Sequence, residues 1–336
     1  MKLNLEQIKS VVQGAEEVIL SDEGIEIERF SKDEREVYLT SRLEIRIHTP
    51  AGVRLNFKTD AKSIYIKLEA KFTCDRSMFS LDILKNGVLA DSVKNFDDKD
   101  MTGFYSWTEY PLGEYEKTTP LGDGEKEICL VLPYTVRLYI KEISLDDASY
   151  VTPVKKEKTI LFYGDSITHG YDAAHPVNTY ASRISDALGC EAIVMAVGGQ
   201  WFIPRLAKIK NTRSPQYVVV AYGTNDWGSG DKKTFDQNSR EFIEIIKKNY
   251  PDAGIFVITP IWRKDHIKTD SEFEDIFYIG KKLFEICDSL DGVHCIDGWN
   301  LVPHKENFYG DLRLHPNDNG FKEYAKNLLS EIKKYI

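Results

Sequence analysis

The chain has 336 residues, which is long for one compact domain and sufficient for two. Apolar residues make up 42% and aromatic residues 12%, so the chain can bury sizeable cores and does not read as disordered. The net charge of −9 at pH 7 argues against nucleic acid or an anionic membrane as the main partner, because both select basic surfaces.

The N-terminal segment contains neither a long uncharged apolar core nor a small-residue cleavage site, so we expect no signal peptide. No apolar stretch is long enough to span a bilayer, and we expect no membrane partner. The cysteines are odd in number, widely spaced and without a C-x-x-C pair; they are Cys74, Cys129, Cys190, Cys287 and Cys295. This usage favours buried free thiols and predicts a cytoplasmic protein.

Residues 1–150 have the pattern of a β domain. Short segments alternate apolar and polar residues and are separated by Gly, Pro, Asn and Asp; they span 38–50, 52–60, 63–72, 79–93, 126–133 and 137–147. Asn86-Gly87 lies between two apolar runs and predicts a hairpin turn. Several strands without intervening helices indicate an antiparallel β-sandwich, followed by a polar linker at 151–158.

Residues 159–336 have a different pattern, in which apolar strands alternate with amphipathic helices. The strands are predicted at 159–164, 191–197, 217–223, 254–260 and, shorter, at 294–299; the helices at 179–188, 203–210, 234–249, 271–289 and 317–334. Strands this apolar are typical of a parallel sheet that is covered on both faces. The second domain is therefore expected to be a doubly wound α/β domain.

Polar and glycine residues follow the carboxyl ends of these strands, where open α/β sheets bind their ligands. In chain order they are Gly164-Asp165-Ser166, Gly198-Gly199, Gly223-x-Asn225-Asp226 and, before the last helix, Asp311 and His315. This set fits acyl transfer. A serine nucleophile needs a base, the base needs a residue that orients it, and the oxyanion needs N–H donors.

The order of these motifs resembles that of the SGNH (GDSL-type) hydrolases, from Thr159 to the C-terminus. The resemblance implies a flavodoxin-like three-layer α/β/α domain that hydrolyses or transfers acyl esters with no metal and no other cofactor. It also implies that Ser166 is the nucleophile and His315 the base. The oxyanion hole would consist of the Ser166 N–H, the Gly199 N–H and the Asn225 side chain.

One position departs from the family pattern. The family places its acid three residues before the histidine, where this chain has Leu312, whereas Asp311 lies four residues before His315. Either the loop holds one extra residue and Asp311 still orients His315, which we favour, or a Ser–His dyad operates. From its local sequence alone, Ser166 also fits the N-cap of a helix.

Three tryptophans, Trp201, Trp227 and Trp262, follow strand ends and are predicted to form an aromatic rim that binds substrate; ordinary core packing is the alternative. His175 is expected to be exposed. Members of the resembled family include two-domain enzymes with a jelly-roll-like N-terminal domain, and this chain, with Trp107 in a long aromatic loop, is similar to them. That domain could form a wall of the pocket, a dimerisation surface or a sugar-binding sandwich. The sequence also allows the chain to form a homo-oligomer.

The sequence as a whole therefore predicts a serine esterase that removes a small acyl group, expected to be acetyl, from a carbohydrate or polyol. The substrate would be a small molecule or an oligosaccharide ester. Two alternatives stay open: an acyltransferase that uses the same acyl-enzyme, and a carbohydrate-binding protein on an inactive hydrolase scaffold.

Overall fold

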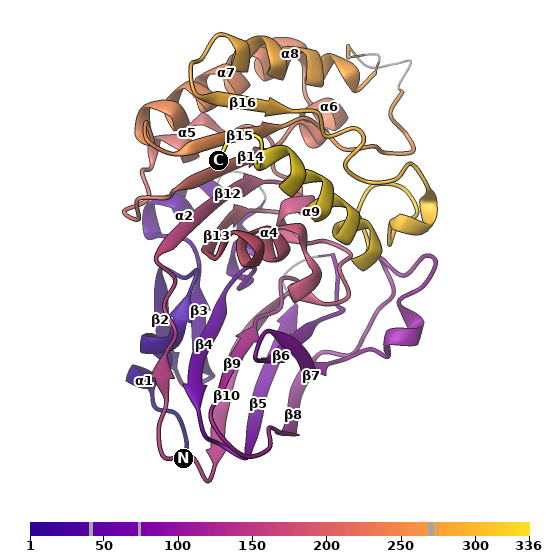
Figure 1. The fold of residues 1–336 in the computed structure, drawn as a ribbon. Coiled ribbons are helices and arrows are strands. Elements are labelled where there is room, and N and C mark those ends of the chain that lie inside the picture. The colour runs from indigo at the N-terminus through magenta and orange to yellow at the C-terminus, as the bar shows by residue number, and fades with distance from the viewer. Residues whose placement is uncertain (40–42, 73–74, 268–271, 274) are drawn as a thin grey trace.

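The computed structural model describes residues 1–39, 43–72, 75–267, 272–273 and 275–336. Two parts are stacked on each other, with the antiparallel sheets of the N-terminal half below the α/β half in Figure 1. Cys74 and Ser271, which entered the predictions above, lie outside the described residues.

The α/β half contains a sheet of five parallel strands. They are β12 (Lys158–Gly164), β13 (Cys190–Ala196), β14 (Tyr217–Ala221), β15 (Gly254–Ile258) and β16 (Val293–Ile296). Their order in the sheet is β13-β12-β14-β15-β16, and every neighbouring pair is parallel. The second strand of the half lies outside the first, and the others follow in sequence. This is the flavodoxin-like order, which confirms the predicted fold class.

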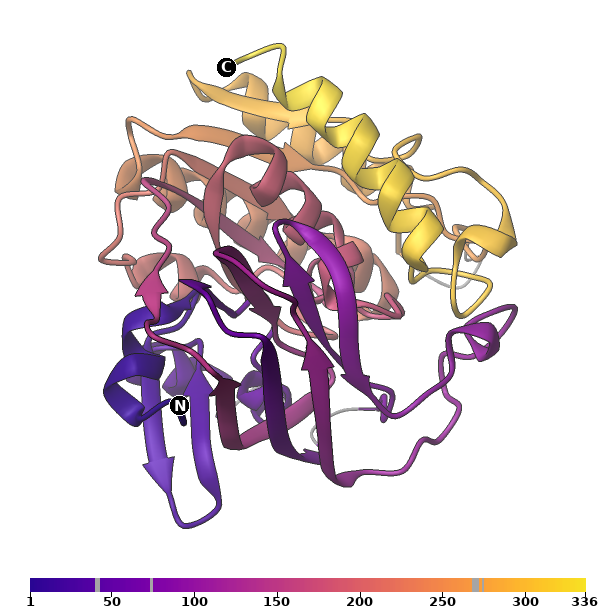
Figure 2. The ribbon, with the colours of Figure 1, turned by 60° about the horizontal axis from the view of Figure 1, so that its bottom comes forward.

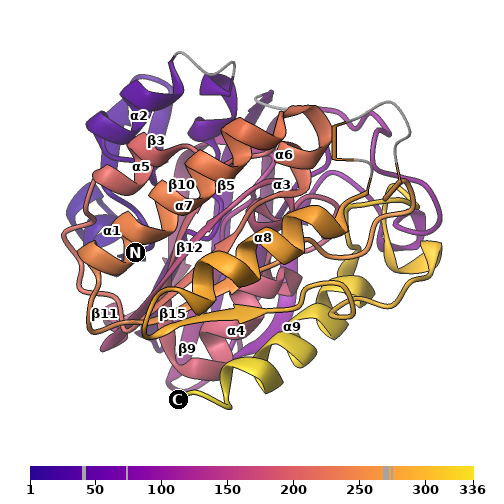
Figure 3. The ribbon, with the colours of Figure 1, turned by 90° about the horizontal axis from the view of Figure 1, so that it is seen from above.

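Helices cover both faces of this sheet, as seen from above in Figure 3. On one face lie α5 (Pro204–Lys208), α7 (Lys232–Asn249) and α8 (Phe277–Asp288); on the other lie α4 (Tyr180–Leu188) and α9 (Asp318–Ile332). Along β12, Leu161 and Tyr163 pack into the first core, whereas Ile160 and Phe162 pack into the second. Strand residues are apolar at consecutive positions because both faces are buried.

The N-terminal half is a sandwich of two antiparallel sheets around one apolar core. The first has the order β1 (Val12–Gln13), β4 (Arg54–Thr59), β9 (Lys126–Val131), β6 (Ser80–Lys85) and β7 (Val88–Lys94), with β11 (Thr152–Pro153) paired to β4. The second has the order β2 (Glu17–Ser21), β3 (Gly24–Glu28), β10 (Val136–Asp146), β5 (Ser63–Phe72) and β8 (Gly113–Pro120). Asn86 and Gly87 join β6 to β7 with φ of 51° and 78°, as a two-residue hairpin turn requires.

Several short helices were not predicted. They are α1 (Leu5–Val11), α2 (Lys32–Tyr38), α3 (Ser166–His169), α6 (Thr224–Ser229) and the 3₁₀ turns η1 (Glu44–His48), η2 (Asp98–Asp100), η3 (Pro176–Asn178) and η4 (Glu306–Phe308). The strand predicted at 38–50 is wrong, because its described part contains η1. Ser31 and Glu34 form a capping box at the start of α2, and this S-x-x-E spacing was the missed signal.

The two halves share buried structure. Phe30, Tyr38 and Ile47 of the N-terminal half belong to the same core cluster as α5, α7 and the parallel strands. Arg29, only 1% exposed, donates from its guanidinium to the carbonyls of Val194 and Ala196 on β13 at 2.7 and 2.8 Å. Figure 2 shows, on the other side of the molecule, the loop that carries η2 close to the start of α9. The N-terminal half thus reaches the region where the strand-end loops gather.

Candidate active site

The turn after β12 places Ser166 at the start of α3. Asp165, not Ser166, is the N-cap residue, and its carboxylate accepts the N–H of Ile167 at 2.9 Å. The capping alternative for Ser166 is therefore wrong. Gly164 is required just before this turn, because a Cβ there would lie 2.0 Å from the Thr168 hydroxyl. Burial raises the pKa of Asp165 to about 6.

Ser166, His315 and Asp311 form a continuous hydrogen-bonded chain. The Ser166 Oγ lies 2.8 Å from His315 Nε2, and His315 Nδ1 lies 2.8 Å from Asp311 Oδ2. With the Nδ1 proton donated to the Asp311 carboxylate, Nε2 can accept the hydroxyl proton of Ser166. Burial opposes ionisation of Asp311, but the hydrogen bond and charge of His315 and the backbone N–H groups outweigh it, so its pKa lies well below the usual range.

The loop between Asp311 and His315 accommodates its extra residue in one unusual backbone conformation. Leu312 has a φ of 56°, in the left-handed region, and its N–H donates to the Tyr309 carbonyl at 3.2 Å. Asp311 Oδ1 then accepts the N–H groups of Arg313, Leu314 and His315 at 2.9, 2.7 and 3.0 Å. The carboxylate thereby holds the loop and still reaches the imidazole four residues later.

The segment after β13 forms a tight turn at Val197–Gln200. The Gln200 N–H donates to the Val197 carbonyl at 3.1 Å, and Gly199 has a φ of 84°, as position three of a type II turn requires. The Gly198 N–H is engaged with His169 Nδ1 at 3.1 Å. Within the described part of the chain the Gly199 N–H forms no hydrogen bond. Of the two glycines, Gly199 is therefore the one that can donate to a substrate oxygen.

Asn225 lies in the first turn of α6, beyond β14, and is half-buried. Its amide Nδ2 donates to the Gln200 carbonyl at 2.8 Å, which joins α6 to the turn that contains Gly199. A primary amide has two N–H donors, and this bond uses one of them. Asp226 strengthens the same junction, because its carboxylate accepts the Phe202 N–H at 3.3 Å; burial raises the pKa of Asp226 to about 7.

Side chains of the N-terminal half hold the Val197–Gln200 turn, and sequence reasoning missed them. Arg46 donates to the Gly198 carbonyl at 2.6 Å, and the Tyr38 hydroxyl donates to the Gln200 side-chain oxygen at 2.8 Å. No local spacing could reveal these pairs, since their partners lie more than 150 residues apart in sequence.

His169 completes the support of this turn. Burial, and then the charge of Arg29, hold the pKa of His169 well below its usual range, so the imidazole is neutral. Because Nδ1 accepts the Gly198 N–H, Nε2 carries the proton and donates to the Thr49 hydroxyl at 2.8 Å. A histidine of the α/β half thus connects the turn to the N-terminal half.

The three predicted rim tryptophans have different environments. Trp227 is 1% exposed inside the core, with the Arg263 guanidinium 4.7 Å above its ring, so its prediction as a substrate contact is wrong. Its position on the helix α6 turns the ring inward. Trp201 and Trp262 are half-buried. The prediction for His175 is also wrong, because this residue is only 8% exposed and pairs with Asp82.

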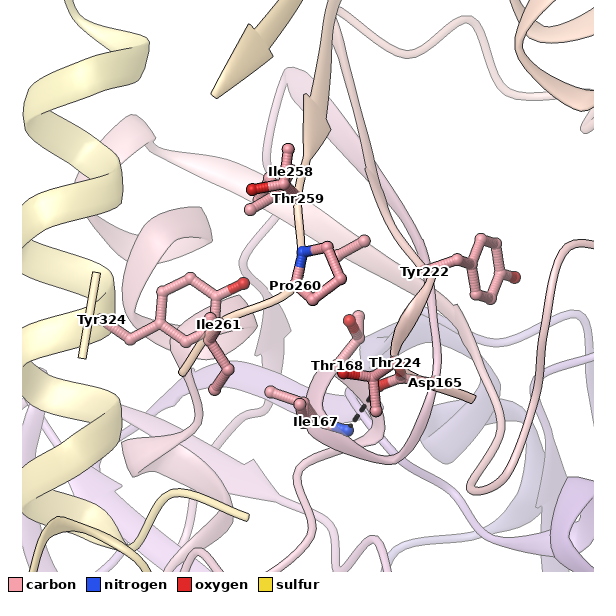
Figure 4. A pocket seen from close by; sticks show the side chains of 11 residues that line it. Asp165, Ile167, Thr168, Tyr222, Thr224, Ile258, Thr259, Pro260, Ile261 and Tyr324 are labelled. Carbon is pink, nitrogen blue, oxygen red and sulfur yellow. Dashed lines mark hydrogen bonds between the residues drawn. The ribbon is translucent and has the colours of Figure 1, made fainter. Parts of the chain in front are cut away.

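Among the cavities beside these loops, two adjoin the segments that carry Asn225 and Asp165. A hollow of about 200 Å³ is lined by Asn225 and by Trp201, Asp226, Gly230, Asp231, Thr234 and Phe235. Figure 4 shows the second cavity, which adjoins Asp165 and Thr224 and has Tyr324 of α9 on its other side. Its volume is about 10 Å³, which is the space of roughly one water molecule, so it is no substrate site.

Two groups of described side chains bring three ligand-type atoms within 4.8 Å of one another: Glu26, Glu28 and His48, and Asp172, Asp311 and His315. In both groups, hydrogen bonds and ion pairs already account for the contacts. Arg137 binds Glu26 with two nitrogens, and Arg76 donates to Asp172 at 2.9 Å. The geometry of the second group is that of an acid–base pair rather than of a metal centre.

The α/β half matches a known family. Residues 162–322 match the model of the GDSL-like Lipase/Acylhydrolase family. The match lies within the α/β half and covers all four strand-end motifs. This match agrees with the resemblance of the motifs, which implied a serine ester hydrolase of the GDSL type. No curated protein sequence matches it.

Solved structures of the same architecture cover nearly the whole chain. A salicylyl-acyltransferase, SsfX3, from a tetracycline biosynthetic pathway is 20% identical with a TM-score of 0.79, covering 96% of this chain and 94% of its own. A protein from Bacteroides ovatus described as a GDSL-like lipase is 19% identical with a TM-score of 0.77, covering 99% and 98%. A family two carbohydrate esterase from Clostridium thermocellum, solved with cellohexaose, is 16% identical with a TM-score of 0.65, covering 96% and 98%.

These similarities extend over both halves, so the two-part architecture is shared with the similar structures. At 16–20% identity, the similar structures establish the fold of the chain. Among the residues that the structure describes, no helix combines the length and the apolar character needed to cross a membrane.

Proposed function

We propose that the protein is a serine esterase that cleaves small acyl esters, expected to be acetyl esters of a carbohydrate or polyol, through an acyl-enzyme on Ser166. The observation that carries the proposal is the chain of two 2.8 Å contacts from Ser166 to His315 and from His315 to Asp311. A nucleophile, its base and the residue that orients the base require this linear order.

In the proposed mechanism, His315 Nε2 takes the hydroxyl proton while Ser166 Oγ attacks the ester carbonyl carbon. The N–H groups of Ser166 and Gly199 and the Asn225 amide stabilise the resulting oxyanion. When the intermediate collapses, the alcohol leaves with the proton from His315, and the acyl group stays on Ser166. Water then repeats the sequence through His315 and releases the carboxylic acid and the free serine. Asp311 stabilises the imidazolium that forms in both halves of the reaction.

The size of the hollow beside Asn225 supports a small acyl group. About 200 Å³ is less than the roughly 300–1,000 Å³ of typical small-molecule pockets. Trp201 lines this hollow, and we propose that Trp201 and Trp262 contact the substrate. The carbohydrate is supported by the similar carbohydrate esterases. We also propose the domain limits 1–150, 151–158 and 159–336, and the cytoplasm as the compartment, since the described cysteines are free thiols.

An acyltransferase is the second candidate, because the similar structures include a salicylyl-acyltransferase. Ser166 is 5% exposed and His315 8% exposed, so an acceptor alcohol that fills the site could exclude water from the acyl-enzyme. An added alcohol that diverts the acyl group from the acid would favour this candidate. A purely carbohydrate-binding function leaves the hydrogen-bonded chain from Ser166 to Asp311 without a role.

The test is release of p-nitrophenol from acetyl, butyryl and octanoyl esters by the wild type and by Ser166→Ala. We expect turnover of the acetyl ester that the substitution abolishes, with an unchanged melting temperature because Asp165 caps α3. Turnover that survives in Ser166→Ala would refute the proposal. A preference for octanoyl over acetyl would refute the small acyl group but not the nucleophile.

A further inference from the structure

A second carboxylate, that of Asp172, lies beside His315. It is fully buried, and its Oδ2 is 3.9 Å from His315 Nδ1, compared with 2.8 Å for Asp311. Asp172 has a φ of 70°, a left-handed conformation that is uncommon for residues other than glycine. The position lies in the loop after α3 and was not singled out by its sequence.

Residues of the N-terminal half hold this carboxylate in place. Arg76 Nε donates to Asp172 Oδ1 at 2.9 Å. The Ser106 hydroxyl lies 2.8 and 2.7 Å from the two carboxylate oxygens, and the Tyr105 hydroxyl donates to the Asp172 carbonyl at 2.6 Å. Ser106 and Tyr105 lie in the aromatic loop, so the loop and Arg76 act together on a residue next to the imidazole.

The charges around His315 can be assigned to named residues. Asp311 and Asp172 face Nδ1, and Asp165 lies near enough to be affected by the imidazole charge. Arg76 pairs with Asp172 and also with Asp75, whose Oδ2 lies 3.1 Å from Arg76 Nη1. Its guanidinium lies 4.6 Å from the ring of Trp107 and 5.3 Å from that of Tyr171. Burial raises the pKa of Asp172, while the charges of His315 and Arg76 act in the opposite direction.

We propose that Asp172, held by Arg76 and Ser106, is a positioning residue for His315, so the N-terminal half completes the active site. This inference rests on the proposed function. A carboxylate without a counter-charge would compete with Asp311 for the imidazolium, whereas Arg76 without the carboxylate would repel it. Together they place a fixed carboxylate 3.9 Å from the imidazole, with its charge largely balanced by Arg76. The role of the N-terminal half is then to supply this pair to the reaction.

The experiment measures the titration of His315 by NMR of the ring, assigned by comparison with His315→Gln, and the pH dependence of ester turnover. Asp172→Asn removes the buried carboxylate beside Arg76 and leaves its guanidinium paired with the exposed Asp75. We expect its His315 titration and the acid limb of kcat/KM to move about one pH unit or more toward lower pH. Adding Arg76→Met removes the guanidinium charge, so the double variant should return toward the wild-type position.

The matched control is Asp82→Asn, which removes a fully buried carboxylate on β6 of the N-terminal half that pairs with His175. It should lower the melting temperature without moving the His315 titration. Equal titrations in wild type and Asp172→Asn, or a double variant displaced further than Asp172→Asn, would overturn the inference.

If Asp172→Asn fails to fold, Ser106→Ala offers a second test. It removes the hydroxyl that contacts both carboxylate oxygens of Asp172 and leaves the charge unchanged. We expect a several-fold fall in kcat at constant KM and recovery in Ser106→Thr; an unchanged kcat would overturn the inference. Because the NMR titration needs no turnover, failure of the proposed function and failure of this inference give different results.

Discussion

Replacing Asp311 with Asn tests whether a triad or a dyad operates. The Asp311 carboxylate accepts three backbone N–H groups on Oδ1 and His315 Nδ1 on Oδ2. Asn keeps Oδ1, so the backbone bonds and the loop persist. Its NH₂ group, however, donates toward Nδ1 and favours the tautomer with the proton on Nε2. That tautomer cannot accept the proton of Ser166.

The expected loss in kcat is about 10⁴-fold, the size of the same substitution in the Ser-His-Asp template. At about 1.36 kcal/mol per tenfold, this corresponds to roughly 5 kcal/mol of transition-state stabilisation. The assay is turnover of the acetyl ester at pH 7, with thermal melting as a measure of folding.

The control for this prediction is Asp311→Ala, which also leaves the N–H groups of Arg313, Leu314 and His315 without their acceptor. It should melt at a lower temperature than Asp311→Asn. A kcat for Asp311→Asn within a few-fold of wild type, with folding intact, would refute the reasoning and favour a Ser–His dyad.

Three further predictions concern the loops and the boundary between the halves. Asn225→Ala should lower kcat about 10²–10³-fold if the amide stabilises the oxyanion, and near-wild-type kcat would exclude that role. Arg29→Met leaves the Val194, Ala196 and Thr49 carbonyls without their donor, so urea unfolding should show a loss of about 3 kcal/mol or more; a loss under 1 kcal/mol would contradict the buried contacts. Burial opposes protonation of His175, but the hydrogen bond and charge of Asp82 outweigh it and raise its pKa to about 9. The resulting stability is complete below about pH 6.5 and is lost as the pH rises through about 9, so His175→Gln should remove this part of the pH dependence of unfolding; an identical dependence in the variant would argue against the ion pair.

The parallel sheet and its strand-end motifs were predictable because each depends on local sequence. Consecutive apolar residues in β12 reflect burial on both faces, and the spacing of Ser166, Asn225 and His315 follows from the strand ends that carry them. The extra residue before His315 was visible as a departure from the family pattern. The left-handed conformation of Leu312 that accommodates this residue could not be predicted, because it depends on the folded loop.

What could not be predicted depends on contacts between distant segments. Arg46 and Tyr38 belong to a region that looked like a strand, and they act on a turn more than 150 residues later. Trp227 occupies the expected position after its strand, but the direction of the short helix α6 buries the ring. The sequence pattern identified the residues that follow each strand but not the partners that orient them.

Arg29 has a consequence for how the α/β half behaves without its neighbour. β13 is one of the two edge strands of the parallel sheet, and the carbonyls of Val194 and Ala196 accept hydrogen bonds from the Arg29 guanidinium. Exposed edge strands invite pairing with other chains, and covering the edge is one way in which proteins prevent aggregation. Arg29, near the start of the polypeptide, therefore occupies edge carbonyls of a strand that is synthesised much later. Separating the halves would expose the edge of β13 to pairing with other chains. It would also remove the side chains that hold the Val197–Gln200 turn.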